Sequence, residues 1–283
     1  MPEGDTVWLA AERMRTALAG STLRRGEFRI PRLATVDLTG ATVREVLARG
    51  KHLLIRLDDG RTLRTHFRMD GSWHIYRSGA TWHGGPSYDV RVVLATEEWE
   101  CVGYRLHDIQ LVATSEEERL VGHLGPDVLG PDWDLEEALR RLREHPDEQV
   151  GVAILDQRNL AGIGNLYKVE TLFLCGVNPW ARVGDVDNLA DVVTRARTLM
   201  LANRHHPEQT TTGISRRGQD HWVAGRKGRP CRRCGTAILL GEQGPPTQER
   251  VTWWCPRCQA ARSPIDPRAR TGEPDRPQPV TLS

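Results

Sequence analysis

Residues 153–167 read AILDQRNLAGIGNLY, and this stretch decides how the second half of the chain folds. Apolar residues at helical spacing lead into Gly162 and Gly164, and an amphipathic segment begins at Asn165. We therefore expect two helices joined by a glycine turn. Glycines ahead of a helix expose backbone N–H groups, and the helix dipole at that end favours an anion. Asn165 suits either capping of the second helix or donation of its amide to a phosphate. Taken alone, the motif also fits a plain helical hairpin.

Downstream lie two cysteine pairs, Cys231 with Cys234 and Cys255 with Cys258, separated by twenty residues. Four thiolates in two such pairs are typical of a closed, tetrahedral zinc site, so we predict one structural zinc ion in a zinc-ribbon hairpin. Arg250 lies in that hairpin, where its planar guanidinium would suit a phosphate. The other two cysteines, at 101 and 175, are predicted to be buried thiols.

Upstream, the pattern changes from helical to strand-like. Short, partly alternating segments at residues 43–46, 53–57, 62–67, 73–76, 90–95 and 100–106 are separated by turn sequences, which predicts a β-sandwich or barrel. A helix is expected before them at residues 6–18, and further helices are expected at 135–142 and 187–202. The change of pattern places a domain boundary near residue 115.

Two turns in the strand-rich part carry candidate functional residues. Lys51 follows a glycine and precedes an apolar strand, so it either points into a cleft and holds a phosphate or is an exposed turn lysine. Met69 stands on a tight turn, where a methionine either fills the core or forms an apolar wedge between bases.

Composition is that of a globular protein: 283 residues, 39% hydrophobic and 27% charged. The sequence contains no long apolar run and no secretory signal, so we expect a cytoplasmic protein with reduced thiols. Charge is unevenly distributed. Residues 116–148 hold eleven acids and four Lys/Arg, whereas residues 204–262 hold eleven Lys/Arg and four acids. The basic segment predicts a polyanionic partner, with a solvated charged face as the alternative.

The chain begins Met1-Pro2-Glu3-Gly4-Asp5-Thr6. Removal of Met1 would leave Pro2 as a free secondary amine, and an α-amino group titrates near ~8, so part of it is nucleophilic at neutral pH. Such an amine can form an iminium ion with an aldehyde, and the adjacent Glu3 could transfer protons at the same centre. The alternative is an ordinary helix N-terminus with proline in the first turn.

Taken in order, the Pro-Glu start, the Gly-Ile-Gly-Asn-Leu-Tyr turn and the four-cysteine hairpin strongly resemble the formamidopyrimidine-DNA glycosylase / endonuclease VIII family over residues 1–262. The opening Met-Pro-Glu-Gly is closer to the endonuclease VIII branch. The resemblance implies a multidomain α+β fold. Its parts would be a catalytic β-sandwich with an N-terminal helix (1–114), a helical domain with a helix–two-turn–helix motif near 150–175 (115–222), and a zinc finger (223–262). Residues 263–283 are rich in proline and are predicted to form a disordered tail.

The resemblance implies that the protein is a bifunctional DNA glycosylase and AP lyase of base excision repair. It would act on damaged DNA as a monomer. Pro2 would be the nucleophile, Glu3 the general acid/base, and Lys51 the lysine that contacts phosphate near the lesion. Asn165 and Arg250 would be phosphate clamps, and Met69 a wedge. A non-catalytic lesion-binding protein of the same fold is the alternative.

Two departures from the family pattern bear on the substrate. The family often has a glutamate at the sixth position, where this chain has Thr6. The formamidopyrimidine branch supplies an Arg-Phe pair that residues 104–110, YRLHDIQ, do not contain. The sequence therefore favours oxidised pyrimidines over oxidised guanine.

Overall fold

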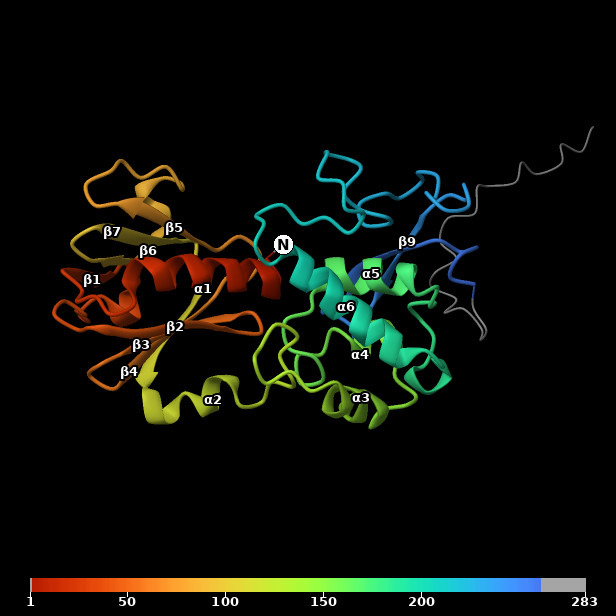
Figure 1. Ribbon diagram of the computed structural model, residues 1–283, viewed down its shortest axis with the longest axis horizontal. Helices are drawn as coiled ribbons and strands as arrows, with labels where there is room; N and C mark the ends of the chain where they lie inside the picture. The colour runs from red at the N-terminus through yellow and green to blue at the C-terminus, as the bar shows by residue number, and fades with distance from the viewer. Residues whose placement is uncertain (1, 261–283) are drawn as a thin grey trace, which may run out of the picture.

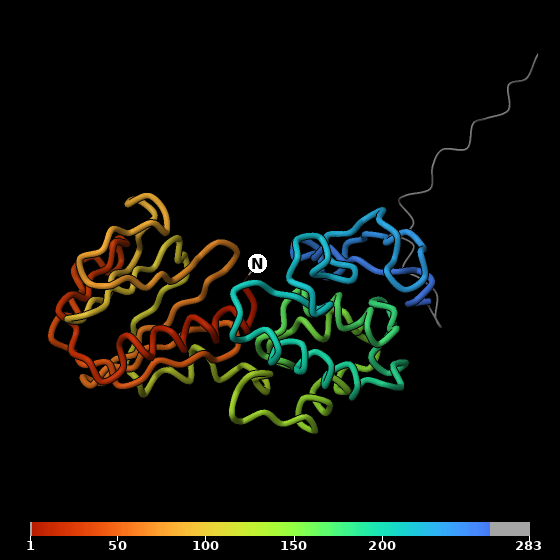
Figure 2. Tube along the Cα trace, turned by 45° about the horizontal axis from the view of Figure 1, so that its top comes forward, coloured from red at the N-terminus to blue at the C-terminus, as the bar shows by residue number. Residues whose placement is uncertain are grey.

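The computed structural model describes residues 2–260, and the tail predicted at 263–283 lies outside them. Figure 1 shows two halves, a β-sandwich and a group of helices, with the N-terminus between them. The tube in Figure 2 shows the blue C-terminal part lying against the helical half.

The sandwich consists of two four-stranded antiparallel sheets, with strand orders β1-β6-β7-β5 and β2-β3-β4-β8. The strands are β1 (Arg25–Phe28), β2 (Val43–Arg49), β3 (His52–Leu57), β4 (Arg61–His66), β5 (Ser72–Arg77), β6 (Val90–Ala95), β7 (Trp99–Tyr104) and β8 (Asp108–Ala113). All six strands predicted from the sequence are present. Sequence analysis missed β1, which is only four residues long, and β8, which contains the polar residues Asp108 and Gln110.

Helix α1 (Gly4–Leu18) packs against β2 and belongs to the core of the sandwich. Its residues Val7, Met14 and Leu18 are fully buried together with Val46 and Leu53 of the strands. The predicted helix at residues 6–18 is confirmed and begins two residues earlier. Because α1 is anchored along its apolar face, the residues that precede it are held in a defined place.

The helical half contains α2 (Glu118–Val121), α3 (Leu135–Arg143), α4 (Val150–Ala153), α5 (Asn165–Leu174) and α6 (Leu189–Asn203). Single 3-10 turns lie at Pro31–Leu33, Ser87–Asp89, Thr114–Glu116 and Val183–Asp185. The prediction of a helix running up to Gly162 was wrong, because α4 ends at Ala153. The side chain of Asn159 donates to the carbonyl of Ala153 at 3.0 Å, and Asp156 accepts from the backbone of Arg158 at 2.9 Å. Both side chains stabilise a turn in place of further helix.

The C-terminal part holds one hairpin of β9 (Leu239–Gln243) and β10 (Arg250–Trp254). A segment without helix or strand joins it to α6, and the buried carboxylate of Glu170 on α5 fixes the middle of that segment. Glu170 accepts from the backbone N–H groups of Trp222, Val223 and Ala224, each at 2.8 Å. The hairpin region is thereby attached to α5.

Candidate active site

Glu3 is fully buried at the junction of the two halves, and its carboxylate lies on the N-terminus of α5. It accepts from the backbone N–H of Gly164 at 2.8 Å and from that of Leu166 at 2.7 Å. These groups have no partner within the helix, and the helix dipole favours a negative charge there. The anion site predicted at this helix end therefore exists, and in this structure it holds the chain's own carboxylate. Pro2, which precedes Glu3, is partly buried.

The glycines of this junction allow two backbones to approach closely. A Cβ atom on Gly164 would lie 2.4 Å from the Glu3 carboxyl carbon, and one on Gly4 would lie 2.9 Å from the Cα of Gly162. The N–H of Gly4 donates to the carbonyl of Gly162 at 2.9 Å. Only glycine fits at Gly164 without displacing Glu3.

Lys51 lies on the turn between β2 and β3, and this turn is attached to the helical half. Gly50 has a left-handed φ of +57°, and its N–H donates to the buried carboxylate of Asp127 at 2.7 Å. Arg49 extends the same contact with an ion pair to Asp132 at 3.1 Å. The turn thus holds Lys51 at the junction, where its charge acts on Glu3.

Burial determines the protonation of both groups. Desolvation raises the pKa of Glu3, and the Lys51 ammonium and the N–H of Leu166 partly oppose this rise. Desolvation lowers the pKa of Lys51, against the attraction of Glu3. A raised pKa makes a carboxyl easier to keep protonated, and a protonated carboxyl can act as a general acid.

Sequence analysis missed Asp5 as a site residue. Its carboxylate is buried and accepts from the hydroxyl of Tyr167 at 2.6 Å and from the amide of Gln209 at 2.8 Å. It is a second negative charge near Glu3 and contributes to the raised pKa of that group. The signal in the sequence was its place two residues after Glu3, in the first turn of α1.

Asn165 contacts the residue that follows Arg250 in the chain. The side-chain amide of Asn165 donates to the carbonyl of Val251 at 2.8 Å, and its Oδ1 is buried without a partner among the described residues. Arg250 begins β10 and is exposed. The two residues predicted to bind phosphate are thus brought together across α5 and the hairpin.

Met69 stands on the turn between β4 and β5 and is 61% exposed, so it does not fill the core. Arg68 before it has a left-handed φ of +55°, and its guanidinium pairs with Asp108 at 2.8 Å. In Figure 2 the orange turn between these strands extends toward the N-terminus. An exposed apolar side chain on a fixed turn is compatible with a wedge.

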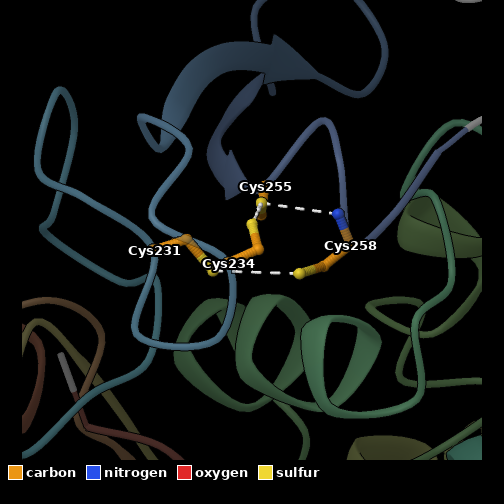
Figure 3. Close-up of side chains that lie close together, drawn as sticks. All are labelled: Cys231, Cys234, Cys255 and Cys258. Carbon is orange, nitrogen blue, oxygen red and sulfur yellow. Dashed lines mark hydrogen bonds between the residues drawn. The ribbon is translucent and has the colours of Figure 1, made fainter.

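The four predicted zinc ligands form one cluster, shown in Figure 3 with their side chains pointing toward one another. Their sulfur atoms all lie within 4.8 Å of each other, with 3.9 Å between Cys231 and Cys258 and 3.4 Å between Cys234 and Cys255. Tetrahedral Zn–S bonds of about 2.3 Å require similar separations. The cluster can therefore hold a metal ion. Of the remaining cysteines, Cys101 is buried as predicted and Cys175 is partly exposed.

Two family models match the chain: the formamidopyrimidine-DNA glycosylase N-terminal domain over residues 1–125 and the formamidopyrimidine-DNA glycosylase H2TH domain over residues 124–189. The chain therefore belongs to the formamidopyrimidine-DNA glycosylase / endonuclease VIII family, as predicted from its sequence. DNA glycosylase and AP lyase, the enzyme class predicted for it, is the class of this family.

Similar proteins show to which branch of the family the chain is related. The chain is 55% identical to the probable endonuclease 8 2 of Streptomyces coelicolor, over 96% of this chain and 98% of the relative. It is 44% identical to the DNA-(apurinic or apyrimidinic site) lyase Nei2 of Mycolicibacterium smegmatis, over 92% and 100%. These names confirm the endonuclease VIII branch.

The same fold occurs in Lactococcus lactis Fpg, solved as a complex with DNA containing an abasic site. The TM-score is 0.75 at 21% sequence identity, over 92% of this chain and 100% of that one. The predicted β-sandwich and helical H2TH domain are confirmed. Within residues 2–260, no helix is long and apolar enough to cross a membrane.

Proposed function

We propose that the protein is a bifunctional DNA glycosylase/AP lyase that removes oxidised bases from damaged DNA and then cleaves the strand at the abasic site. The observation that carries this proposal is the placement of Glu3, fully buried on the N-terminus of α5 and directly after Pro2. Burying a carboxyl is costly, and here the two N–H groups of Gly164 and Leu166 offset part of that cost. A buried carboxyl beside a chain-terminal amine suits a reaction in which an amine forms a bond and a proton moves at the same centre.

In the proposed mechanism, the Pro2 nitrogen attacks the anomeric carbon of the sugar while the bond from that carbon to the base breaks, and the departing base takes the proton that the Pro2 nitrogen gives up. Glu3 as an acid donates a proton to the ring oxygen, which opens the sugar, and the nitrogen lone pair forms an iminium ion. The iminium acidifies the neighbouring sugar carbon, and the Glu3 carboxylate accepts the proton that this carbon loses. The electron pair left behind expels the 3′ phosphate (β-elimination), and loss of a second sugar proton expels the 5′ phosphate (δ-elimination). Hydrolysis of the iminium then releases Pro2.

DNA would bind across the junction. Lys51 would contact phosphate near the lesion, Asn165 and Arg250 would clamp further phosphates, and Met69 would enter the space left by the rotated nucleotide. Such contacts would offset the few kcal/mol that base rotation costs. The solved Lactococcus lactis Fpg complexes with DNA support this partner.

We propose one zinc ion as the cofactor, held by Cys231, Cys234, Cys255 and Cys258. Zinc in a closed four-thiolate site stabilises the fold and supplies no chemistry to the reaction. The proposed domain boundaries lie after residues 114 and 222, and the first is supported by the end of β8 at Ala113. As a repair enzyme, the protein would act as a monomer in the bacterial cytoplasm, at the nucleoid.

Oxidised pyrimidines are the proposed preferred lesions. Residues 105–107 are Arg-Leu-His, and Arg105 is engaged by Asp89 at 2.9 Å instead of projecting freely. This loop therefore lacks the phenylalanine that would follow the arginine to fill the space opposite a rotated purine. A comparison of excision rates on one duplex carrying either an oxidised pyrimidine or an oxidised guanine tests this preference.

The activity itself is tested by borohydride trapping on an oligonucleotide with a single abasic site, followed by mass spectrometry of the adduct. We expect a covalent complex that maps to Pro2. Absence of a complex from protein whose Met1 is removed and whose zinc is present would favour the alternative, a non-catalytic lesion-binding protein.

A further inference from the structure

Lys168 lies one turn beyond Asn165 on α5, and its side chain is only 1% exposed. Its Nζ donates to the hydroxyl of Thr252 on β10 at 2.7 Å and to Oε1 of Gln243 on β9 at 3.5 Å. Both partners are uncharged. A buried ammonium without a paired acid is costly, so a lysine at this position calls for an explanation.

The contacts of Lys168 reach the strand that carries Arg250. The hydroxyl of Thr252 also donates to the carbonyl of Arg250 at 3.3 Å and to Gln243 at 3.4 Å. One ammonium therefore joins α5 to both strands of the hairpin, and its partner Thr252 lies two residues after Arg250 on β10. The same helix holds Glu3 at its N-terminus, so Lys168 links the candidate catalytic end to the hairpin.

Two charged groups act on Lys168: Glu3, from the segment before α1, and Arg250, from β10. Its neighbours on β9 and β10, Gln243 and Thr252, carry no charge. Burial and, to a lesser degree, Arg250 lower the pKa of Lys168 to about 7, against the attraction of Glu3. A phosphate held by Asn165 and Arg250 would add negative charge beside this group and favour its protonated form.

We propose that Lys168 is a positioning residue that couples the hairpin to α5 and takes up a proton when a DNA phosphate binds at Asn165 and Arg250. The inference rests on the proposed role of those two residues. Proton uptake at Lys168 would make DNA affinity fall as pH rises above neutral. The reason is that the free protein then binds fewer protons at Lys168 than the DNA complex does. The coupling would also align Arg250 with the helix end that holds Glu3.

The test uses the whole zinc-loaded protein and a duplex with a stable abasic-site analogue. Calorimetric titrations at pH 8 in buffers of different ionisation enthalpy give the number of protons taken up on binding. We expect wild type to take up more protons than Lys168→Arg and Lys168→Met, the first being always charged and the second never. Lys51 can also titrate, so only the difference between wild type and these variants is assigned to Lys168.

Affinity separates the positioning role from simple packing. The methionine of Lys168→Met has nearly the same length as lysine but no charge. This variant should bind DNA roughly tenfold more weakly than wild type at pH 6.5, which is a typical size for a coupling between sites. Lys168→Arg, which keeps the charge, should retain most of the affinity. Equal proton uptake in wild type and both variants would overturn the proposal. If Lys168→Met does not fold with bound zinc, the Lys168→Arg comparison decides alone. Borohydride trapping on the same preparations tests the proposed function separately, since a trapped wild-type complex without excess proton uptake would refute only the inference about Lys168.

Discussion

Two of the regions that carry proposed site residues, the N-terminal segment and the β9–β10 hairpin, are held in different ways. The N-terminal segment is fixed by buried hydrogen bonds, with Glu3 on the N–H groups of Gly164 and Leu166. The β9–β10 hairpin packs on a small apolar cluster that includes Phe173 and Ile238, and the four-cysteine cluster lies at its base. A small core of this kind is commonly completed by a metal. The comparison implies that catalysis and DNA binding can be lost independently of each other.

The largest expected effect is on catalysis. Glu3→Gln should lower the rate of base excision by about 10²–10⁴-fold, the usual contribution of general acid–base catalysis, while binding to abasic-site DNA changes little. Single-turnover excision and equilibrium binding measure the two. Because the glutamine NH₂ would oppose one of the N–H donors, a stability loss of about 1–3 kcal/mol should be checked by denaturation. Normal excision by this variant would remove the acid/base role of Glu3.

A substitution at Gly164 tests the N-terminal segment without altering the carboxyl group of Glu3. Gly164→Ala would place a Cβ 2.4 Å from the carboxyl carbon of Glu3 and displace it. We expect excision to fall about 10²-fold, since small misplacements of reacting groups have effects of that size. Gly184→Ala is the matched control, because its Cβ meets only Pro146, at 3.3 Å. Similar excision rates for the two variants would contradict the model of Glu3 placement.

Loss of metal should affect the other region. Chelation of zinc, or Cys258→Ser, should release Arg250 and weaken DNA binding by roughly tenfold to a hundredfold, as expected for losing a charge-assisted hydrogen bond worth about 1.5–3 kcal/mol. Binding is measured at one fixed salt concentration, with metal content determined on the same sample. Unchanged affinity after verified metal loss would show that the hairpin does not depend on the metal.

Met69→Ala tests a residue outside both regions. The side chain is exposed, so stability should be unaffected, while excision from a duplex should fall by up to about tenfold if the wedge offsets unstacking. Excision from a single strand should not change, because no stacked base has to be replaced. An equal loss on both substrates would assign Met69 a role other than a wedge.

The smallest expected effects are shifts in pH dependence. The charge of Lys51 lowers the pKa of Glu3, and the charge of Asp5 raises it. If Glu3 acts as an acid in the rate-limiting step, activity declines as pH rises through its pKa. Lys51→Met should then move this alkaline limb to higher pH and Asp5→Asn should move it to lower pH, as measured by single-turnover pH profiles. Shifts in the same direction would contradict the assignment.

Sequence reasoning was most accurate where a local pattern has one physical solution. Alternating apolar residues predicted six of the eight strands of the sandwich, and cysteine spacing predicted the cluster of four sulfur atoms. It failed where side chains override the local pattern, as in the turn after α4 that Asn159 stabilises.

The sequence by itself determined the family, the order of the three parts, the four-cysteine cluster and the candidate residues Pro2, Glu3, Lys51, Asn165 and Arg250. Only the tertiary structure decided how these residues combine. It placed Glu3 on the N-terminus of α5, Asp5 beside Tyr167 and Lys168 against Thr252 of β10. The spacing of residues along the chain reveals helices, strands and metal-ligand motifs, because each of these depends on residues close together in sequence. Burial and the resulting pKa shifts depend on groups more than 70 residues apart in sequence, which meet only when the chain has folded.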